Sequence, residues 1–170
     1  MMKYILSLAV FTSLLGLLNS CTVQYSMGGA TIESDVQSLT IEDFSNRSPS
    51  GPSNLGQYFT NELKDKFQSQ TDLSFVDNDG DLMFRGEITD YFTKPASVTG
   101  DETASETRLT ITVNVNFVNQ KHPDNNFETS FSHYEEFDAD QNLSDVEDQL
   151  VEDILEKVVD DIFDKSVVNW

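Results

Sequence analysis

Cysteine is almost missing from this chain. Cys21 is the only cysteine among 170 residues, so no intrachain disulfide is possible. An exported protein rarely keeps a free thiol, whereas an acylated cysteine is not free. The residues around Cys21 therefore decide what this cysteine is for.

Basic residues are also scarce. The chain has ten Lys and Arg against thirty Asp and Glu, and its formal net charge is -20. If residues 1–20 are removed, Lys3 goes with them, and nine basic residues remain against thirty acidic ones. A protein this acidic is not expected to bind nucleic acid or an anionic membrane through general electrostatics.

Groups for catalysis are few. His122 and His133 are the only imidazole bases, and neither lies in a local nucleophile motif such as G-x-S-x-G. No phosphate-binding glycine loop is present, and carboxylates are so numerous that any acid/base pair would be an arbitrary choice. We therefore expect a protein that is not an enzyme and has no catalytic residues. A zinc site made by His122, His133 and Glu135 across one hairpin is a less favoured alternative.

The longest apolar run is too short to span a bilayer. It covers residues 4–18 behind Lys3, whereas a membrane span needs about 20 apolar residues. A positive residue followed by such a run is typical of a secretory signal. Leu18 lies three residues before Cys21 and the small Ser20 directly before it, which resembles the lipobox of bacterial lipoproteins.

The lipobox predicts how the chain is processed. We expect residues 1–20 to be a lipoprotein signal peptide, residues 21–38 a lipid-anchored tether, and residues 39–170 an α+β domain. Cys21 would carry diacylglycerol and an N-acyl chain such as palmitate, with no other cofactor. Each buried methylene contributes about 0.8 kcal/mol, so two or three acyl chains hold a protein on a membrane. The alternatives are a secreted protein with one stray thiol and a membrane-spanning anchor.

The first half of the domain predicts a strand and a helix. Residues 39–44 alternate as a strand, with Leu39 and Ile41 on one face, and residues 45–52 read as a loop. A helix follows, capped by Ser53 or Asn54 and ending near Gln70. Its apolar stripe comprises Leu55, Phe59, Leu63 and Phe67, and Glu62 and Lys66 form a supporting pair on its exposed side.

Residues 73–81 predict a short strand and a hairpin turn. The strand covers 73–76, and the turn is the Asn/Asp/Gly-rich segment 77–81. A calcium loop is a weaker interpretation of its alternating aspartates, because the sixth position is Leu82 and no glutamate closes the loop. The next strand has Gly86 as a candidate bulge. Its shared face comprises Leu82, Phe84, Ile88 and Phe92.

The rest of the chain predicts two strands and a long helix. Residues 109–117 alternate strictly between apolar and polar, residues 122–126 turn the chain, and residues 127–137 return with three phenylalanines in register. Ser144 and Glu147 form a capping box for a helix with a wide apolar stripe. The order β-α-β-β-β-β-α predicts a two-layer α+β sandwich, with two helices on one face of an antiparallel-rich sheet of about four to five strands.

Several motifs, in order, resemble the LptE family of lipopolysaccharide-assembly lipoproteins. They cover essentially the whole mature chain. They are Cys21 followed by Tyr25-Ser26 and Gly29-Ala30, Phe44 with Asn46-Arg47, the helix stripe from Leu55 to Phe67, Asp81-Leu82-x-Phe84-x-Gly86-x-Ile88-x2-Tyr91, the strand from Leu109 to Phe117, and the tail from Asp161-Ile162-Phe163 to Val168-Asn169-Trp170.

The resemblance implies a non-enzymatic partner of the outer-membrane β-barrel LptD. In that family the lipoprotein plugs the barrel, helps it fold and assists delivery of lipopolysaccharide, which is the second partner it implies. Thr22 stands where many lipoproteins carry the aspartate that retains them at the inner membrane. We therefore expect an anchor on the periplasmic side of the outer membrane.

Loops carry recognition more often than core elements, so partner contacts are expected at two tips. One follows Arg47, and the other lies between Lys94 and Arg108. The basic residues of the mature chain are few and scattered, which favours the plug role over direct binding of lipid A phosphates. The competing function is a free-standing periplasmic or surface lipoprotein that binds a glycan or another envelope complex.

Overall fold

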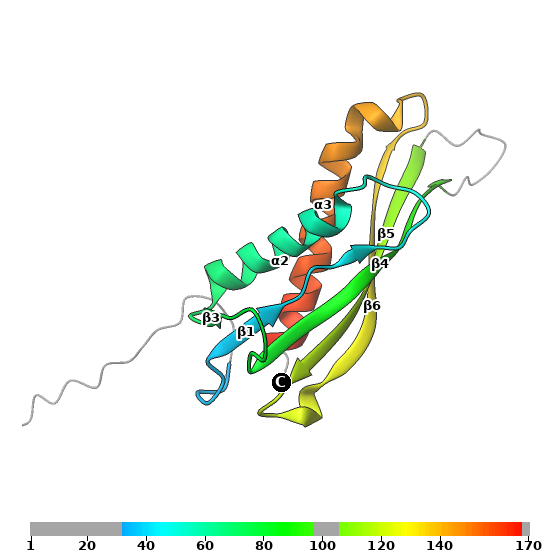
Figure 1. Ribbon diagram of the computed structural model, residues 1–170. Helices are drawn as coiled ribbons and strands as arrows, with labels where there is room; N and C mark the ends of the chain where they lie inside the picture. The colour runs from blue at the N-terminus through cyan, green and yellow to red at the C-terminus, as the bar shows by residue number, and fades with distance from the viewer. Residues whose placement is uncertain (1–31, 97–105, 168–170) are drawn as a thin grey trace, which may run out of the picture.

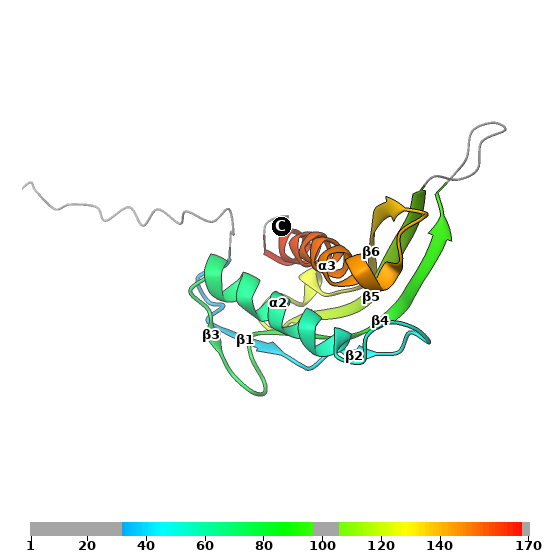
Figure 2. The same cartoon turned by 90° about the horizontal axis from the view of Figure 1, so that it is seen from above.

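The computed structural model describes residues 32–96 and 106–167. The predicted signal peptide, Cys21, most of the tip between Lys94 and Arg108, and residues 168–170 lie outside these ranges. A sheet forms one layer and two helices form the other, as Figures 1 and 2 show. The predicted α+β class is confirmed.

The sheet is mixed and has six strands. Its main path runs β3-β1-β4-β5-β6, and β2 pairs with β4 beside it. β5 is antiparallel to both β4 and β6, whereas β1 lies between β3 and β4 and is parallel to both. The strands are β1 (Ser38–Ile41), β2 (Ser45–Asn46), β3 (Ser74–Phe75), β4 (Leu82–Pro95), β5 (Glu106–Asn119) and β6 (Phe127–Asp138).

The first predicted strand, over residues 39–44, ends early, and a second short strand follows it. β1 ends at Ile41, and β2 forms inside the segment expected to be a loop. Between them the chain turns Phe44 into the core, where it is 3% exposed. The Phe44 amide then donates to the Thr60 hydroxyl at 3.0 Å instead of to a neighbouring strand. This side-chain acceptor interrupts the ladder, which resumes at Ser45 opposite Glu87.

The turn predicted over residues 77–81 is not a hairpin. β3 and β4 are both parallel to β1 and lie on opposite sides of it, so the segment crosses over β1. Parallel strands cannot be joined by a hairpin turn. The Thr40 hydroxyl holds the crossover in place, because it accepts from the Gly80 amide at 3.0 Å and donates to the Val76 carbonyl at 3.1 Å.

The bulge in β4 lies at Thr89 rather than at Gly86. The register with β5 shifts between Ile88 and Asp90, so Tyr91 takes the inward position predicted for Phe92. Tyr91 is 5% exposed. Gly86 stays in regular pairing, and a Cβ there would lie 2.0 Å from the Asn114 carbonyl oxygen. Glycine at this position allows close backbone approach and does not mark a bulge.

Both helices pack on the apolar face of the sheet. They are α2 (Leu55–Gln70) and α3 (Leu143–Val167), and the predicted stripe of α2 is buried throughout. The Phe67 ring of α2 lies 5.0 Å from the ring of Phe84 on β4 and 5.0 Å from that of Phe163 on α3. The core therefore joins both helices and the sheet. No helix in the described ranges is long and apolar enough to cross a membrane.

Three predicted polar details of the helices are wrong. Asn54 precedes α2 without a side-chain capping bond, and α3 begins one residue before Ser144. Glu147 does not close a capping box, because it accepts a hydrogen bond from the Tyr91 hydroxyl. Lys66 pairs with Asp160 of α3 at 2.7 Å and not with Glu62. For Glu147 and Lys66, a partner from another element replaces the local one.

Candidate functional site

One face of the sheet has no helix over it. We call it the open face, and it consists of the side chains of β4, β5 and β6 that point away from α2 and α3. From Leu109 to Asn119 of β5, buried odd-numbered residues alternate with half-buried even-numbered ones. Cross-strand register places the following residues on the open face: Arg85, Glu87, Phe92, Lys94, Arg108, Thr110, Thr112, Asn114, Asn116, Glu128, Ser130, Ser132, Tyr134 and Glu136.

The middle of the open face is a hydrogen-bonded polar ladder. Asn116 accepts from Arg85 Nε at 3.1 Å and donates to Glu128 at 3.5 Å. The hydroxyls of Thr112 and Ser132 lie 3.0 Å apart. These cross-strand contacts satisfy the side chains within the sheet, so this part of the face is polar and largely neutral.

The basic-aromatic cluster, as we call it, lies on the open face where β4 ends and β5 begins. Its members are Phe92, Lys94, Arg108, Tyr134 and Glu136. Arg108 donates to Glu136 Oε1 through Nε at 3.1 Å and through Nη2 at 2.6 Å, and its Cζ atom lies 3.7 Å from the centre of the Tyr134 ring. The Glu136 hydrogen bond raises the pKa of Arg108. Lys94 Nζ lies 4.5 Å from the centre of the Phe92 ring.

The structure brings together two of the three predicted contact residues. Lys94 and Arg108 are direct partners across β4 and β5, whereas Arg47 lies at the end of β2. Arg47 pairs with Glu87 at 3.4 Å, and its side chain is 72% exposed. In the loop after it, Gly51 adopts a φ of 101° and lies directly against the ring of Tyr91.

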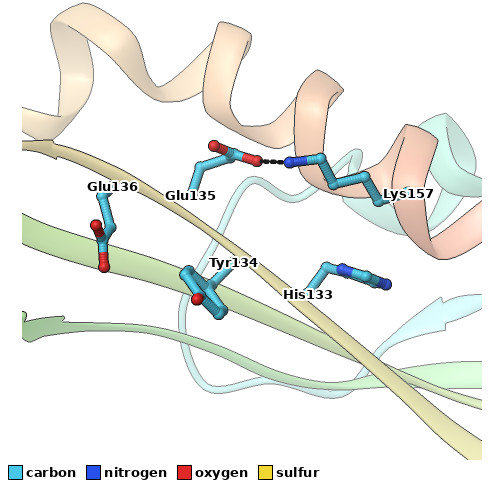
Figure 3. Close-up of a pocket in the computed structure, with 5 residues that line it drawn as sticks. All are labelled: His133, Tyr134, Glu135, Glu136 and Lys157. Carbon is cyan, nitrogen blue, oxygen red and sulfur yellow. Dashed lines mark hydrogen bonds and ion pairs between the residues drawn. The ribbon is translucent and has the colours of Figure 1, made fainter.

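The inward side of β6 holds a separate polar group beneath α3. Glu135 pairs with Lys157, and His133 Nε2 lies 2.6 Å from Asp161. Figure 3 shows Glu135 reaching toward the helix while Tyr134 and Glu136 point to the other side of the strand. A shallow pocket of about 370 Å³ opens beside them. These two pairs give partners to the polar side chains on the inward side of β6, which is otherwise apolar.

The structure does not bring the predicted zinc ligands together into a metal site. His122 pairs with Asp35 at 3.1 Å, whereas His133 pairs with Asp161. Across residues 32–96 and 106–167 no group of three or more His, Cys, Asp or Glu side chains could hold a metal ion. These ranges include the segment 77–81, the candidate calcium loop.

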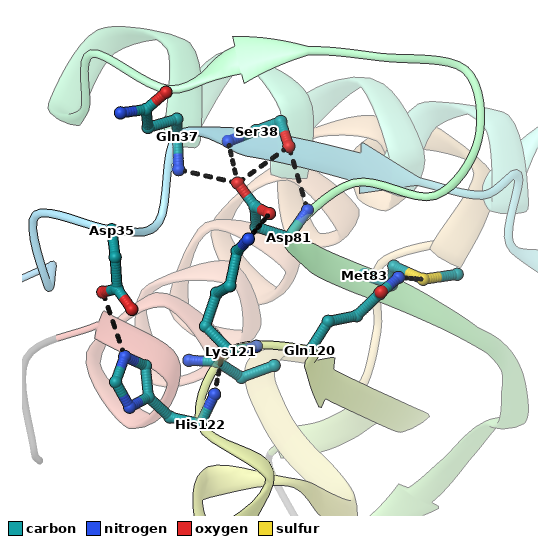
Figure 4. A network of polar contacts seen from close by, with 9 residues as sticks. Asp35, Gln37, Ser38, Asp81, Met83, Gln120, Lys121 and His122 are labelled. Atoms are coloured by element: carbon teal, nitrogen blue, oxygen red, sulfur yellow. Dashed lines mark hydrogen bonds and ion pairs between the residues drawn. The ribbon is translucent and has the colours of Figure 1, made fainter.

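The end of the domain nearest residue 32 is held by a polar network. Asp81 Oδ2 accepts from the Gln37 amide at 2.9 Å and from the Ser38 amide at 3.1 Å. The Gln37 backbone bond, and after it the bond from the Ser38 hydroxyl, lower the pKa of Asp81. Lys121 Nζ lies 3.3 Å from Asp81 Oδ1, and next to it His122 reaches Asp35. Figure 4 shows that the β5–β6 turn thereby ties down the start of β1.

Sequence reasoning missed Tyr134, Glu136 and Phe92 as parts of the cluster. The signal for the first two was present, because the three phenylalanines of residues 127–137 stand at odd-numbered positions, and the even-numbered residues of a strand then point to the other face. Phe92 could not be found in this way, since the bulge at Thr89 reverses the alternation beyond it.

The fold defines a class: a two-layer α+β domain in which both helices cover one face of the sheet and leave the other face open. The chain belongs to the LptE family, whose model, described as lipopolysaccharide-assembly, matches residues 36–166. This family is a non-enzymatic one. No curated protein sequence matches the chain significantly.

Solved structures of bacterial lipoproteins share the fold at low sequence identity. Rare lipoprotein B from Shewanella oneidensis has 14% identity and a TM-score of 0.53, with 74% of this chain and 90% of that chain covered. Lipoprotein B from Nitrosomonas europaea has 13% identity and a TM-score of 0.50, covering 82% and 86%. A minor lipoprotein from Acinetobacter baumannii has 12% identity and a TM-score of 0.50, covering 76% and 91%.

Proposed function

We propose that this protein is an outer-membrane lipoprotein that acts as the non-enzymatic plug and assembly partner of an LptD-like β-barrel in lipopolysaccharide transport. The observation that carries the proposal is the LptE family match across residues 36–166. Cys21 is the proposed lipid attachment site, and its acyl chains would anchor the protein in the periplasmic leaflet. Signal removal before Cys21 is part of the same proposal.

The geometry supports a role inside a polar enclosure. Barrel interiors in outer membranes are polar, and a plug must present hydrogen-bonding groups to them. The open face does so along three long strands, and its central ladder is largely neutral. The basic-aromatic cluster lies at the end of β4 and β5 opposite the polar network that holds residues 35–38. The anchored end and the contact end of the domain are therefore well separated.

We assign the barrel contacts to the loop after Arg47 and to the tip between Lys94 and Arg108, with the basic-aromatic cluster beside that tip. Lipopolysaccharide is the second partner that we propose for this cluster. Arg108 is already bound by Glu136, whereas Lys94 has no ion pair with any described residue. Lys94 is therefore the cation best placed to meet a phosphate group.

The test is a mild-detergent purification of the acylated protein from its own outer membranes, with mass spectrometry of the retained proteins and assay of retained lipopolysaccharide. We expect a stoichiometric β-barrel of the LptD kind. Replacing the loop after Arg47 and the tip before Arg108 with short neutral turns should release the barrel and leave the domain folded. Changing Cys21→Ser should remove the lipid and the membrane association.

Matched point variants test the cluster. Lys94→Gln with Arg108→Gln should reduce barrel and lipopolysaccharide recovery, whereas Lys64→Gln with Lys165→Gln removes the same charge elsewhere and should not. Recovery of the wild-type protein without any β-barrel would contradict the proposed plug role. A free-standing binding lipoprotein would then be the better account.

A further inference from the structure

A surface with an excess of negative charge lies between α2 and α3, away from the open face. At the N-terminal end of α2 a pocket of about 230 Å³ opens toward α3. Its floor is apolar and is made by Pro52, Leu55 and Val151. The helices lie next to each other at this end in both views (Figures 1 and 2).

The rim of this pocket is acidic and continues along the helices. Asp148 and Glu152 of α3 line the pocket together with Tyr58 of α2. Burial raises the pKa of Glu62 of α2, and the charges of nearby carboxylates, including Glu152, raise it further. Glu62 lies one turn before Lys66, whose ion pair with Asp160 places this side of α2 against α3. We call Tyr58, Glu62, Asp148, Glu152 and Glu156 the acidic seam.

The next turn of the same groove shows what the acidic seam lacks. Lys66 lies four residues after Glu62, and Asp160 lies four residues after Glu156. These two side chains form an ion pair at 2.7 Å across the helices. In the acidic seam, glutamates stand on both helices, so the equivalent contact is repulsive.

No Lys or Arg side chain among the described residues forms an ion pair with a carboxylate of the acidic seam. All nine Lys and Arg residues after residue 31 are described, and each has its contact elsewhere. Six of them form ion pairs with other acids, namely Arg47, Lys64, Lys66, Arg108, Lys121 and Lys157. The other three contact uncharged side chains: Arg85 contacts Asn116, Lys94 contacts Phe92, and Lys165 contacts Phe127.

We propose that the acidic seam binds a basic segment of a protein partner, placing a Lys or Arg side chain between Glu62 and Glu152 and an apolar side chain in the pocket beside them. Charge complementarity supports a basic occupant, and the apolar floor supports a peptide over a simple ion. The carboxylates are also not grouped closely enough to hold a metal ion within the described ranges. The proposal does not depend on the identity of the β-barrel, because the acidic seam lies on the helical layer and not on the open face.

The experiment measures binding of a labelled synthetic peptide, with one leucine between two arginines, to the acylated full-length protein in neutral detergent. Fluorescence anisotropy reports the Kd. The test variant is Glu62→Gln with Glu152→Gln. The control, Glu42→Gln with Asp124→Asn, removes two exposed carboxylates that make no ion pair with described residues. Both double variants have the same net charge.

We expect the test variant to bind about tenfold more weakly, since it loses two charge contacts, and the control to stay within about twofold of wild type. Changing the peptide leucine to serine should weaken binding to wild type and to the control. Equal losses in both double variants would mean general attraction to an acidic protein and would overturn the proposal. It would also fail if Mg²⁺, at matched ionic strength, displaced the peptide more effectively than Na⁺.

Discussion

At the scale of single residues, Tyr91 joins three parts of the chain that are far apart in sequence. Its ring lies under Gly51, its hydroxyl donates to Glu147 at the start of α3, and its backbone pairs with Ile111. Burial, and then the Glu147 contact, raise the pKa of Tyr91 above its usual range. Tyr91 therefore stays neutral at all ordinary pH values and acts as a fixed donor.

The pair formed by His122 and Asp35 makes a pH-dependent contribution at the opposite end of the domain. Its hydrogen bond raises the pKa of His122 above 6.5 and lowers that of Asp35 below 3.8. The stabilisation from His122 is complete below pH 6.5 and is lost as the pH rises through the raised pKa. The stabilisation from Asp35 is present above pH 3.8 and is lost as the pH falls through the lowered pKa.

We therefore expect Asp35→Asn to lower the thermal midpoint between about pH 4 and pH 6.5 and to have little effect at pH 9. NMR titration of the His122 ring should show its pKa returning toward 6.5 in this variant. Asp124→Asn, a nearby exposed change, serves as the control. An Asp35→Asn variant with the wild-type His122 pKa would disprove the coupling.

At the scale of elements, α2 is held against the start of β2 by a glycine contact. A Cβ at Gly56 would lie 2.2 Å from the Phe44 carbonyl oxygen, although Gly56 is in a helix. Helix propensity alone favours alanine there by about 1 kcal/mol. The backbone contact should reverse that preference, because neither the helix nor β2 can move without disturbing the core.

We predict that Gly56→Ala lowers the free energy of unfolding by about 1–3 kcal/mol, the usual range for overpacking. Gln57→Ala, at an exposed position in the same turn, should be neutral or slightly stabilising. Urea unfolding followed by circular dichroism measures both. A stabilised Gly56→Ala variant would show that α2 is free to shift away from Phe44.

Local periodicity predicted the elements well where one face is buried. The stripe of α2 and the odd-numbered face of β5 lie inside as expected, because burial follows directly from the period of each element. The parallel position of β1 could not be predicted, since it depends on which strands meet after the helix crossover. The cluster at Arg108 was found only in part, because a bulge has no reliable local signal and decides which side Phe92 faces.

At the scale of the whole molecule, acidic groups dominate the helical layer. The net charge of -20 is spread unevenly, and the acidic seam concentrates part of it where two helices meet. Repulsion between exposed charges is screened by salt over distances of about 10 Å at 0.1 M. Stability should therefore depend on ionic strength more than it does for a neutral domain.

We predict that the thermal midpoint of the wild-type protein rises with added NaCl. The Glu62→Gln, Glu152→Gln variant should be more stable than wild type at low salt, by up to about 1 kcal/mol, with a weaker salt dependence. The Glu42→Gln, Asp124→Asn variant should gain less. Scanning calorimetry at several NaCl concentrations measures this, and identical salt slopes for wild type and seam variant would argue against repulsion in the groove.

The length of β4 has a consequence for reach. This strand has 14 residues and, at about 3.3 Å per residue, spans about 45 Å from the polar network near Asp81 to the cluster at Lys94. Eleven positions separate Cys21 from Ile32, which allows at most about 40 Å of extended chain. If Cys21 carries the lipid, the length of the β4–β5 hairpin limits how far from the membrane the basic-aromatic cluster can lie. The length of the chain between Cys21 and Ile32 then limits how much this distance can vary.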